Sequence, residues 1–204
     1  MPVCVIFGAG DEFPDSIVLP DGKKYIIAAD GGLRSLEKLG ITPDHIVGDL
    51  DSLDEQPDEK IFTKLPHIKD TTDTFEAVRI GQAYGCTEFH IYGGTGGRLD
   101  HTLANIQLAG MLAQEKQQAF IYGHGYVITA ISDSSFTLPC RKSGFVSVFA
   151  LNDVCKGVDI HGLMYETDSA ELTNTFSLGV SNEFIGKPAE ISVKSGTLCI
   201  YYEC

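Results

Sequence analysis

The first 130 residues alternate between short apolar runs and segments with helical periodicity. Leucines recur at positions 33, 36 and 39, a second helix is predicted at about 74–84, and a long amphipathic helix contains Leu103, Ile106 and Leu112. Gly40 and Gly85 follow the first two helices as C-terminal stops. Buried strands are predicted at residues 3–7, 25–29, 45–47, 88–92 and 120–122. This alternation predicts an α/β fold whose N-terminal part is a Rossmann-like open parallel sheet with helices on both faces.

The pattern changes at about Asp133, after which no segment with helical periodicity follows. Short strands separated by turn residues are predicted at 135–138, 145–149, 170–173, 189–193 and 197–201. Such a succession is typical of a small antiparallel β-sandwich or barrel. We therefore predict two domains: an α/β domain over residues 1–130 and a C-terminal antiparallel β-sandwich over residues 131–204.

Composition narrows the class of protein. An apolar fraction of 43% in 204 residues is enough for a real core, and no apolar run approaches the length of a membrane span. The N-terminus lacks the basic region of a signal peptide, and it is predicted to form the first strand. Six scattered cysteines without a CxxC motif indicate neither a zinc site nor a redox pair. A reduced, cytoplasmic protein is the simplest account.

The net charge of −13 restricts the partners. It argues against a nucleic-acid backbone as the main partner and favours a small cationic substrate. Binding of a polyphosphate anion would need a metal ion or a few well-placed basic residues.

Two aspartates follow the third predicted strand. Asp49 and Asp51 in the stretch GDLDS are one residue apart, so in an extended segment both side chains project to the same side. Adjacent carboxylates repel unless a cation or a shared proton intervenes, and hard oxygen ligands suit Mg²⁺. A solvated acidic turn explains this stretch alone equally well.

Other polar clusters also follow strands or strand-like segments. Asp30 precedes two glycines and is a good helix N-cap, although the glycines would also let an anion approach a helix N-terminus. Asp73 with Glu76 three residues later fits an N-cap pair, which is the favoured interpretation of Asp73 in isolation. In an open parallel sheet, ligands bind beyond the carboxyl ends of the strands, where these clusters are expected to meet. Several such clusters at one edge favour a functional site over a set of unrelated caps.

A glycine-rich loop at residues 93–97 joins the fourth strand to the long helix. Four glycines in five residues exceed what a turn requires, yet no Gly-Lys-Ser/Thr follows, so the loop is not a Walker A motif. Arg98 after it can bind phosphate with two parallel hydrogen bonds. Asp100 could cap the helix. His101 is better explained as a polar residue at the start of a helix than as a catalytic base. The earlier Gly8-Ala9-Gly10 fails the dinucleotide fingerprint and favours an ordinary tight turn.

Five motifs together resemble one family. DGG at 30–32, GDLDS at 48–52, KDTTD with its following Glu at 69–76, GGRLDH at 96–101 and GVSNEF at 179–184 occur in the order and rough spacing of thiamine pyrophosphokinases of the bacterial type. The resemblance covers nearly the whole chain. It implies transfer of the diphosphate of ATP to the hydroxyl of thiamine, which gives thiamine diphosphate and AMP.

The resemblance also implies roles by position. The matching metal ligands for Mg²⁺ are Asp49, Asp51 and Asp73. The positions on the nucleotide and phosphate side are Asp30, Gly31, Lys69, Thr72, Gly94 and Arg98. The matching thiamine-binding positions are Asp100, Ser181 and Asn182. The resulting catalytic set is Asp49, Asp51, Asp73, Asp100, Arg98 and Lys69.

The family further implies a homodimer with sites between the catalytic domain (1–130) of one subunit and the thiamine-binding and dimerisation domain (131–204) of the other. One departure is that animal members use a tryptophan near the substrate, whereas this chain has none. Asp100 is the candidate general base. Two alternatives remain open: a related pyrophosphokinase acting on another alcohol, such as a hydroxymethyl pterin, and a non-catalytic nucleotide- or thiamine-binding regulator.

Overall fold

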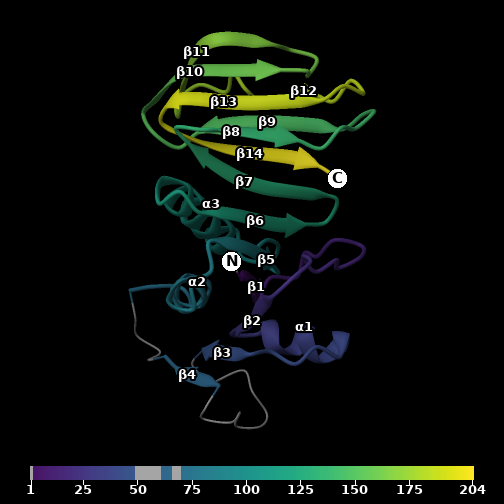
Figure 1. Cartoon of the computed structure of the whole chain (residues 1–204), viewed down its shortest axis with the longest axis vertical. Helices are drawn as coiled ribbons and strands as arrows, with labels where there is room; N and C mark the ends of the chain where they lie inside the picture. Colours follow the sequence, from purple (N-terminus) through teal and green to yellow (C-terminus); the bar gives the residue numbers. More distant parts are fainter. Residues whose placement is uncertain (1, 49–60, 66–69) are drawn as a thin grey trace. The chain divides into compact units, whose positions relative to one another are not determined.

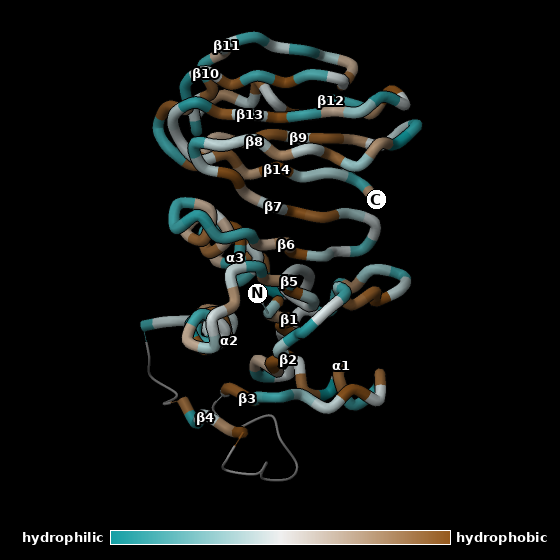
Figure 2. Tube along the Cα trace, in the orientation of Figure 1, coloured by the Kyte–Doolittle hydropathy of each residue, from teal (hydrophilic) through white to brown (hydrophobic). Residues whose placement is uncertain are grey.

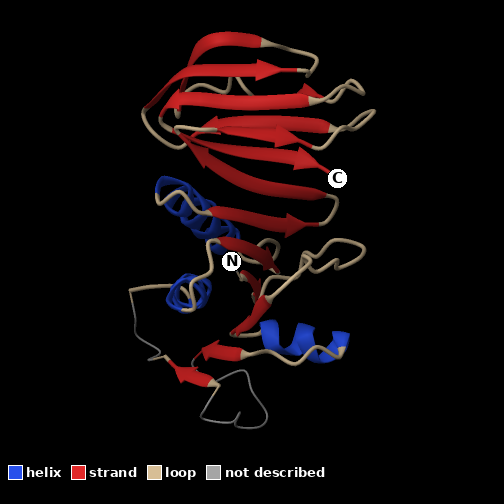
Figure 3. Ribbon diagram, in the orientation of Figure 1, coloured by secondary structure: helices blue, strands red, loops and turns tan. Residues whose placement is uncertain are grey.

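The structure is a computed structural model that describes residues 2–48, 61–65 and 70–204. The predicted site residues Asp49, Asp51 and Lys69 therefore lie outside the described residues. The chain divides into two compact units, one of Met1–Asn105 with Ile121–His124 and the other of Ile106–Phe120 with Gly125–Cys204. The architecture is mixed α/β, with few helices and extensive sheet (Figures 1 and 3).

The first unit contains a parallel sheet in the order β5-β1-β2-β3-β4. The strands are β1 (Val3–Phe7), β2 (Lys24–Ala29), β3 (His45–Gly48), β4 (Phe62–Lys64) and β5 (Glu88–Tyr92). The helices are α1 (Gly32–Leu39), α2 (Asp73–Ala83) and the first part of α3 (Leu99–Gln114). Cys4, Val5, Ile6 and Phe7 are all fully buried, so both faces of β1 are covered, as in other parallel sheets.

A row of aromatic rings links this sheet to the loop after β1. Phe13 stacks on Phe7, Phe7 on Tyr92, and Tyr92 on Tyr122 of β6 (Gln118–Gly123), with ring centroids 6.5, 5.2 and 4.6 Å apart. The Tyr92 hydroxyl donates a hydrogen bond of 2.9 Å to the Val18 carbonyl. Burial raises the pKa of Tyr92 to about 12, so the hydroxyl stays a donor at physiological pH.

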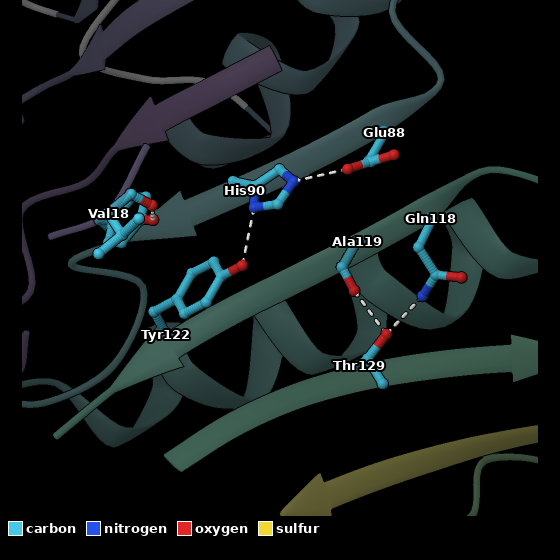
Figure 4. Close-up of polar contacts among 8 residues, drawn as sticks. Val18, Glu88, His90, Gln118, Ala119, Tyr122 and Thr129 are labelled. Atoms are coloured by element: carbon cyan, nitrogen blue, oxygen red, sulfur yellow. Dashed lines mark hydrogen bonds and ion pairs between the residues drawn. The ribbon is translucent and has the colours of Figure 1, made fainter. Parts of the chain in front are cut away.

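Buried polar side chains between β5 and β6 are paired. His90 Nε2 lies 2.8 Å from Glu88 Oε1, and His90 Nδ1 lies 2.7 Å from the Tyr122 hydroxyl (Figure 4). Both ring nitrogens of this buried histidine therefore have partners, which removes the penalty of burying them unpaired. These two contacts, to Glu88 and Tyr122, indicate that His90 has a structural role.

The second unit is built of two antiparallel sheets. One has the strand order β12-β9-β14-β7, the other β11-β10-β13-β8. The rings of Phe136 in one sheet and Tyr202 in the other lie 6.2 Å apart, so the two sheets contact each other. The strands are β7 (Tyr126–Ser132), β8 (Ser135–Leu138), β9 (Phe145–Ala150), β10 (Val154–His161), β11 (Thr167–Thr173), β12 (Asn182–Glu183), β13 (Ala189–Ser195) and β14 (Thr197–Glu203).

Hydropathy follows position in these sheets. The edge strand β11 is largely hydrophilic and exposed (Figure 2), whereas Leu198, Cys199 and Ile200 of the central β14 are buried. Within the same unit, Thr129 Oγ1 of β7 donates to the Ala119 carbonyl at 2.7 Å and accepts from Gln118 Nε2 (Figure 4). Polar residues on buried strand faces are thus satisfied locally.

Most predicted elements are confirmed within two or three residues, but the strands β4, β7, β10 and β12 were missed. β7 is a nearly continuous apolar run that continues directly from β6, with only a two-residue turn between them. β10 carries Gly157 at φ 63°, where the register with β11 shifts, so its alternation is interrupted. The predicted functional boundary at residue 130 stays a prediction.

None of the helices described here combines the length and the apolar character that a membrane crossing requires.

Candidate active site

The ends of β2 and β3 bring Asp30 beside Gly48. The Asp30 N–H donates to the Val47 carbonyl at 2.8 Å, and a Cβ on Gly48 would lie 3.3 Å from Asp30 Cα. Asp30 has φ 50°, a left-handed conformation that is uncommon for a residue other than glycine. The N-cap of α1 is Gly31, with no side-chain cap bond, so the alternative interpretation of Asp30 as a cap is wrong. Asp30 thus stands next to the residue that leads into Asp49.

The start of α2 leaves Asp73 out of helix capping. Thr72 is the N-cap, and its hydroxyl accepts a hydrogen bond of 3.2 Å from the Phe75 N–H. Glu76 accepts a hydrogen bond of 2.7 Å from the Thr71 hydroxyl rather than pairing back to a cap at Asp73. The predicted Asp73–Glu76 cap pair is therefore wrong, because the chain enters the helix one residue earlier. Asp73 lies in the first helical turn, where a carboxylate is favoured by the helix dipole.

The glycine-rich loop is held from two sides. Gly93, Gly96 and Gly97 have φ of 62°, 82° and 57°, which explains why glycines are needed here. The buried Asn105 of α3 donates from Nδ2 to the Gly94 carbonyl at 2.7 Å. On the other side, the Gly10 N–H donates to the Gly93 carbonyl at 2.8 Å. The loop is therefore preorganised by both the α3 helix and the loop after β1.

Two further groups lie at this loop. The Asp11 carboxylate lies against Gly96 so closely that no Cβ would fit there. Thr95 Oγ1 is buried and, among the residues that the structure describes, has no hydrogen-bond partner. Thr95 in the loop between β5 and α3 and Asp11 in the loop after β1 thus place polar groups beside the glycines.

Arg98 and Asp100 form a two-pronged ion pair at the start of α3. Arg98 Nη2 donates to Asp100 Oδ2 at 2.6 Å, and Arg98 Nε donates to Oδ1 at 3.2 Å. Both side chains are exposed. The hydrogen bond from Arg98 holds the pKa of Asp100 below its usual range, and the same contact raises the pKa of Arg98. Two residues with separate predicted roles are thus coupled.

In the second unit, Asn182 organises the segment around Tyr165. Its Nδ2 donates to the Tyr165 carbonyl at 2.6 Å, and its Oδ1 accepts from the N–H groups of Tyr165 and Glu183, both at 2.9 Å. Asn182 is buried, whereas the Tyr165 side chain is exposed. These contacts engage both ends of the carboxamide, so Asn182 positions the tyrosine backbone.

A small pocket of about 240 Å³ lies beside Tyr165, with Leu178 and Val180 among its lining residues. Ser181 next to it has φ 61°, and its N–H donates to the Ser147 hydroxyl at 3.1 Å. The pocket is bordered largely by apolar side chains, with the Asn182 amide at one side.

Of the three predicted metal ligands, Asp73 lies within the described residues, whereas Asp49 and Asp51 lie outside them. Within the described part, one other group of potential ligands stands close together, namely Asp159, His161 and Asp168 on β10 and β11. Asp159 Oδ1 accepts a hydrogen bond of 2.6 Å from the Ser169 N–H, so this carboxylate shapes the hairpin.

Sequence reasoning missed Asp11, Asn105 and Tyr165. A buried asparagine inside an apolar helix face was a usable signal for Asn105, because such a side chain needs a partner. Asp11 and Tyr165 carry no such signal, since an exposed aspartate in a turn and a single tyrosine are ordinary.

Two family models match the chain in order. Residues 19–121 match the model described as "Thiamin pyrophosphokinase, catalytic domain", and residues 135–198 match "Thiamin pyrophosphokinase, vitamin B1 binding domain". The chain is also 26% identical over 198 residues to the thiamine pyrophosphokinase of Bacillus subtilis strain 168, which covers 94% of this chain and 92% of that protein.

Solved structures show the same fold. The thiamine pyrophosphokinase of Bacillus subtilis has a TM-score of 0.87 at 23% identity, covering 100% of this chain and 99% of that one. The thiamin pyrophosphokinase of Geobacillus thermodenitrificans has a TM-score of 0.80 at 23% identity, with 100% and 98% covered. Since the match to the catalytic-domain model alone covers half of the 204 residues and the second model matches in sequence behind it, the chain belongs to the thiamine pyrophosphokinase family.

Proposed function

We propose that this protein transfers the diphosphate group of ATP to the hydroxyl of thiamine, which gives thiamine diphosphate and AMP. The observation that carries this proposal is the presence, in one chain and in order, of matches to the family's catalytic domain and its vitamin B1 binding domain. The second match favours thiamine over a pterin alcohol as the acceptor. The acidic net charge of −13 also suits a cationic acceptor.

For the nucleotide, the chain supplies the preorganised backbone of the glycine-rich loop and the side chain of Arg98. The thiamine oxygen attacks the β-phosphorus of ATP, because AMP is the other product. Transfer of this kind depends on positioning and on stabilising charge at the phosphate oxygens. Arg98 is exposed at the end of the glycine-rich loop, where it can release Asp100 and bind a phosphate oxygen pair. Lys69 is proposed to stabilise charge on the transferred group.

On the acceptor side, Asp100 is the proposed base for the thiamine hydroxyl. Its pKa is held low by Arg98, so it is ionised and able to accept a proton. When Arg98 turns to phosphate, Asp100 loses that partner and becomes a stronger base. One contact would thereby couple phosphate binding to proton removal. Ser181 and Asn182 are proposed to bind or position thiamine in the β unit.

Mg²⁺ is proposed to be held by Asp49, Asp51 and Asp73. Three carboxylates are hard oxygen donors of the kind that Mg²⁺ prefers, and Thr72 rather than Asp73 is the N-cap of α2. When bound, Mg²⁺ would supply positive charge that offsets the negative charge of the phosphates and of the chain. Asp30, Gly31, Thr72 and Gly94 are proposed to contact the nucleotide.

The finer architecture is also proposed. The parallel sheet would form a Rossmann-like catalytic domain over residues 1–130 with helices on both faces, and residues 131–204 a β-sandwich that binds thiamine and forms a homodimer. A cytoplasmic location would agree with six free cysteines. Light scattering of the purified protein tests the dimer.

A product assay tests the reaction. Protein, ATP, Mg²⁺ and thiamine are mixed, and nucleotides and thiamine species are separated by chromatography. AMP that forms in step with thiamine diphosphate is expected. AMP formed only with a hydroxymethyl pterin would overturn the assignment of thiamine as the acceptor, and no AMP with either alcohol would favour a non-catalytic binding protein.

The proposed metal ligands are tested by mutation. Asp49→Asn and Asp51→Asn should each abolish transfer with the fold intact, and near-normal turnover in either variant would refute the metal assignment.

A further inference from the structure

Three side chains on the β10–β11 hairpin of the second unit bring potential metal ligands together. One ligand atom from each of Asp159, His161 and Asp168 lies within 4.8 Å of the other two. One imidazole nitrogen with two carboxylate oxygens differs from an ordinary acidic cluster, because the nitrogen is a donor for transition metals rather than for Mg²⁺ or Ca²⁺. None of the motifs behind the family resemblance contains these residues.

The pairing of the two strands explains how the three residues meet. Asp159 and His161 are two residues apart on β10, so they project from the same side of the strand, opposite to its buried positions. On β11, both Asp168 and Ser169 stand opposite Asp159 alone, because the register between the strands shifts here. Such a bulge redirects side chains, and Asp168 Oδ1 thereby comes to lie 3.6 Å from His161 Nε2.

Asp159 is held in place by both neighbouring strands. Its Oδ1 accepts a hydrogen bond of 2.6 Å from the Ser169 N–H, and its Oδ2 accepts one of 3.3 Å from the Ser192 hydroxyl of β13. Each carboxylate oxygen has two lone pairs, so both oxygens can still donate to a metal ion. Hydrogen bonds of this kind orient a ligand before a metal ion binds.

The other two ligands are available to a metal ion. The side chains of His161 and Asp168 are both exposed, and an exposed ion pair contributes little stability, so a metal ion can replace this contact at small cost. Glu190 of β13 stands directly opposite His161 and adds a further carboxylate nearby. In a chain with a net charge of −13, these surroundings attract a cation.

We infer that Asp159, His161 and Asp168 bind one divalent transition-metal ion such as Zn²⁺, with the remaining coordination positions left to water. The ion would join β10 to β11. All three ligands belong to the second unit, whereas the proposed Mg²⁺ ligands belong to the first. Binding of a metal ion to the hairpin is therefore independent of the proposed function.

The test is calorimetric titration of the protein with ZnCl₂ in excess MgCl₂, which keeps Mg²⁺ on its own ligands. His161→Asn and Asp168→Asn should each weaken the binding of Zn²⁺ by about tenfold or more, because each removes a ligand. The matched control is His124→Asn. His124 Nδ1 also lies 3.6 Å from a carboxylate, that of Asp15, but among the described residues this pair has no third ligand. The control should bind Zn²⁺ like the wild type.

Nuclear magnetic resonance identifies the ligand directly. This is needed because the exposed thiols of Cys140 and Cys204 are other potential ligands for zinc. One equivalent of ZnCl₂ should shift the imidazole nitrogen signals of His161 and leave those of His124 unchanged. Circular dichroism confirms that each variant is folded. Unchanged His161 signals, or equal affinity for Zn²⁺ in the wild type and His161→Asn, would overturn the inference.

A second ion tests the class of metal. CaCl₂ in place of ZnCl₂ should leave the His161 signals unchanged, because Ca²⁺ prefers oxygen donors. An equal response to the two ions would show that the acidic surroundings attract any divalent cation, and it would overturn the assignment of a transition metal. Zn²⁺ should also raise the midpoint of urea unfolding more in the wild type than in His161→Asn, since an ion that binds the folded state stabilises it.

Discussion

Arg98 and Asp100 bind each other through two hydrogen bonds, with Nη2 to Oδ2 at 2.6 Å and Nε to Oδ1 at 3.2 Å. The resemblance assigns Arg98 to phosphate binding and Asp100 to the acceptor pocket. In this structure the two side chains bind each other instead of a substrate group. A phosphate that binds Arg98 must compete with the carboxylate. The exchange is feasible because both side chains are exposed, where an ion pair contributes little stability.

Replacing Asp100 with asparagine tests its two proposed roles, as the base for the thiamine hydroxyl and as the ionic partner of Arg98. Asp100→Asn keeps the size of the side chain but removes the base and the negative partner of Arg98. We expect kcat with thiamine to fall by about 10²-fold, in the range of a lost general base. The KM for ATP should stay the same or fall, since Arg98 is released to phosphate. Steady-state kinetics with each substrate varied in turn check this split, and an unchanged kcat would exclude Asp100 as the base.

Removing Arg98 should change the titration of Asp100. The pKa of Asp100 is depressed by the Arg98 hydrogen bond, so its carboxylate stays ionised as pH falls to its ordinary value of 3.8. In Arg98→Met the pKa should rise toward that value, and the carboxylate should be lost at higher pH than in the wild type. Carboxyl-carbon NMR titration of both proteins measures the shift. An identical Asp100 titration in the two would show that the pair does not persist in solution.

Asn105 is expected to be a positioning residue for the glycine-rich loop. Asn105→Ala leaves the buried Gly94 carbonyl without its donor, which should lower the free energy of unfolding by about 1–3 kcal/mol. The KM for ATP should also rise, because the loop loses its anchor on α3. Asn152→Ala is a matched control, since Asn152 accepts the Thr197 N–H at 2.7 Å in the second unit. If both variants affected the KM for ATP equally, the loop-positioning role would be refuted.

Periodicity predicted elements better than it predicted the roles of polar residues. The strands Val3–Phe7 and Glu88–Tyr92 were predicted to the residue, because each is a short run rich in apolar and aromatic residues that ends at a glycine. The cap predicted at Asp73 was wrong because Thr72, which is also a residue type favoured at N-caps, precedes it and accepts the Phe75 N–H. Asp11 could not be found from sequence, since its position against Gly96 depends on how two loops meet after folding.

Asn182 is predicted to act on thiamine through Tyr165. Asn182→Ala removes the hydrogen bonds that hold the Tyr165 backbone, so we expect the KM for thiamine to rise about tenfold and the KM for ATP to stay unchanged. Tyr165→Ala should give the same pattern, whereas Tyr165→Phe should keep wild-type kinetics if the ring supplies an apolar surface. A normal KM for thiamine in Tyr165→Ala would refute this role.

His45 should make stability depend on pH. Burial lowers its pKa below the ordinary 6.5, and its Nε2 lies 2.8 Å from the Thr63 hydroxyl. Below pH 6.5 the unfolded chain binds a proton at His45 before the folded protein does, so stability decreases as pH falls from 6.5 to the lower folded-state pKa, where the loss is complete. His45→Gln retains a hydrogen-bonding side chain without this titration. Urea unfolding between pH 7.5 and about 5 should therefore show a smaller decrease in the variant than in the wild type; equal slopes would show that other groups cause the pH dependence.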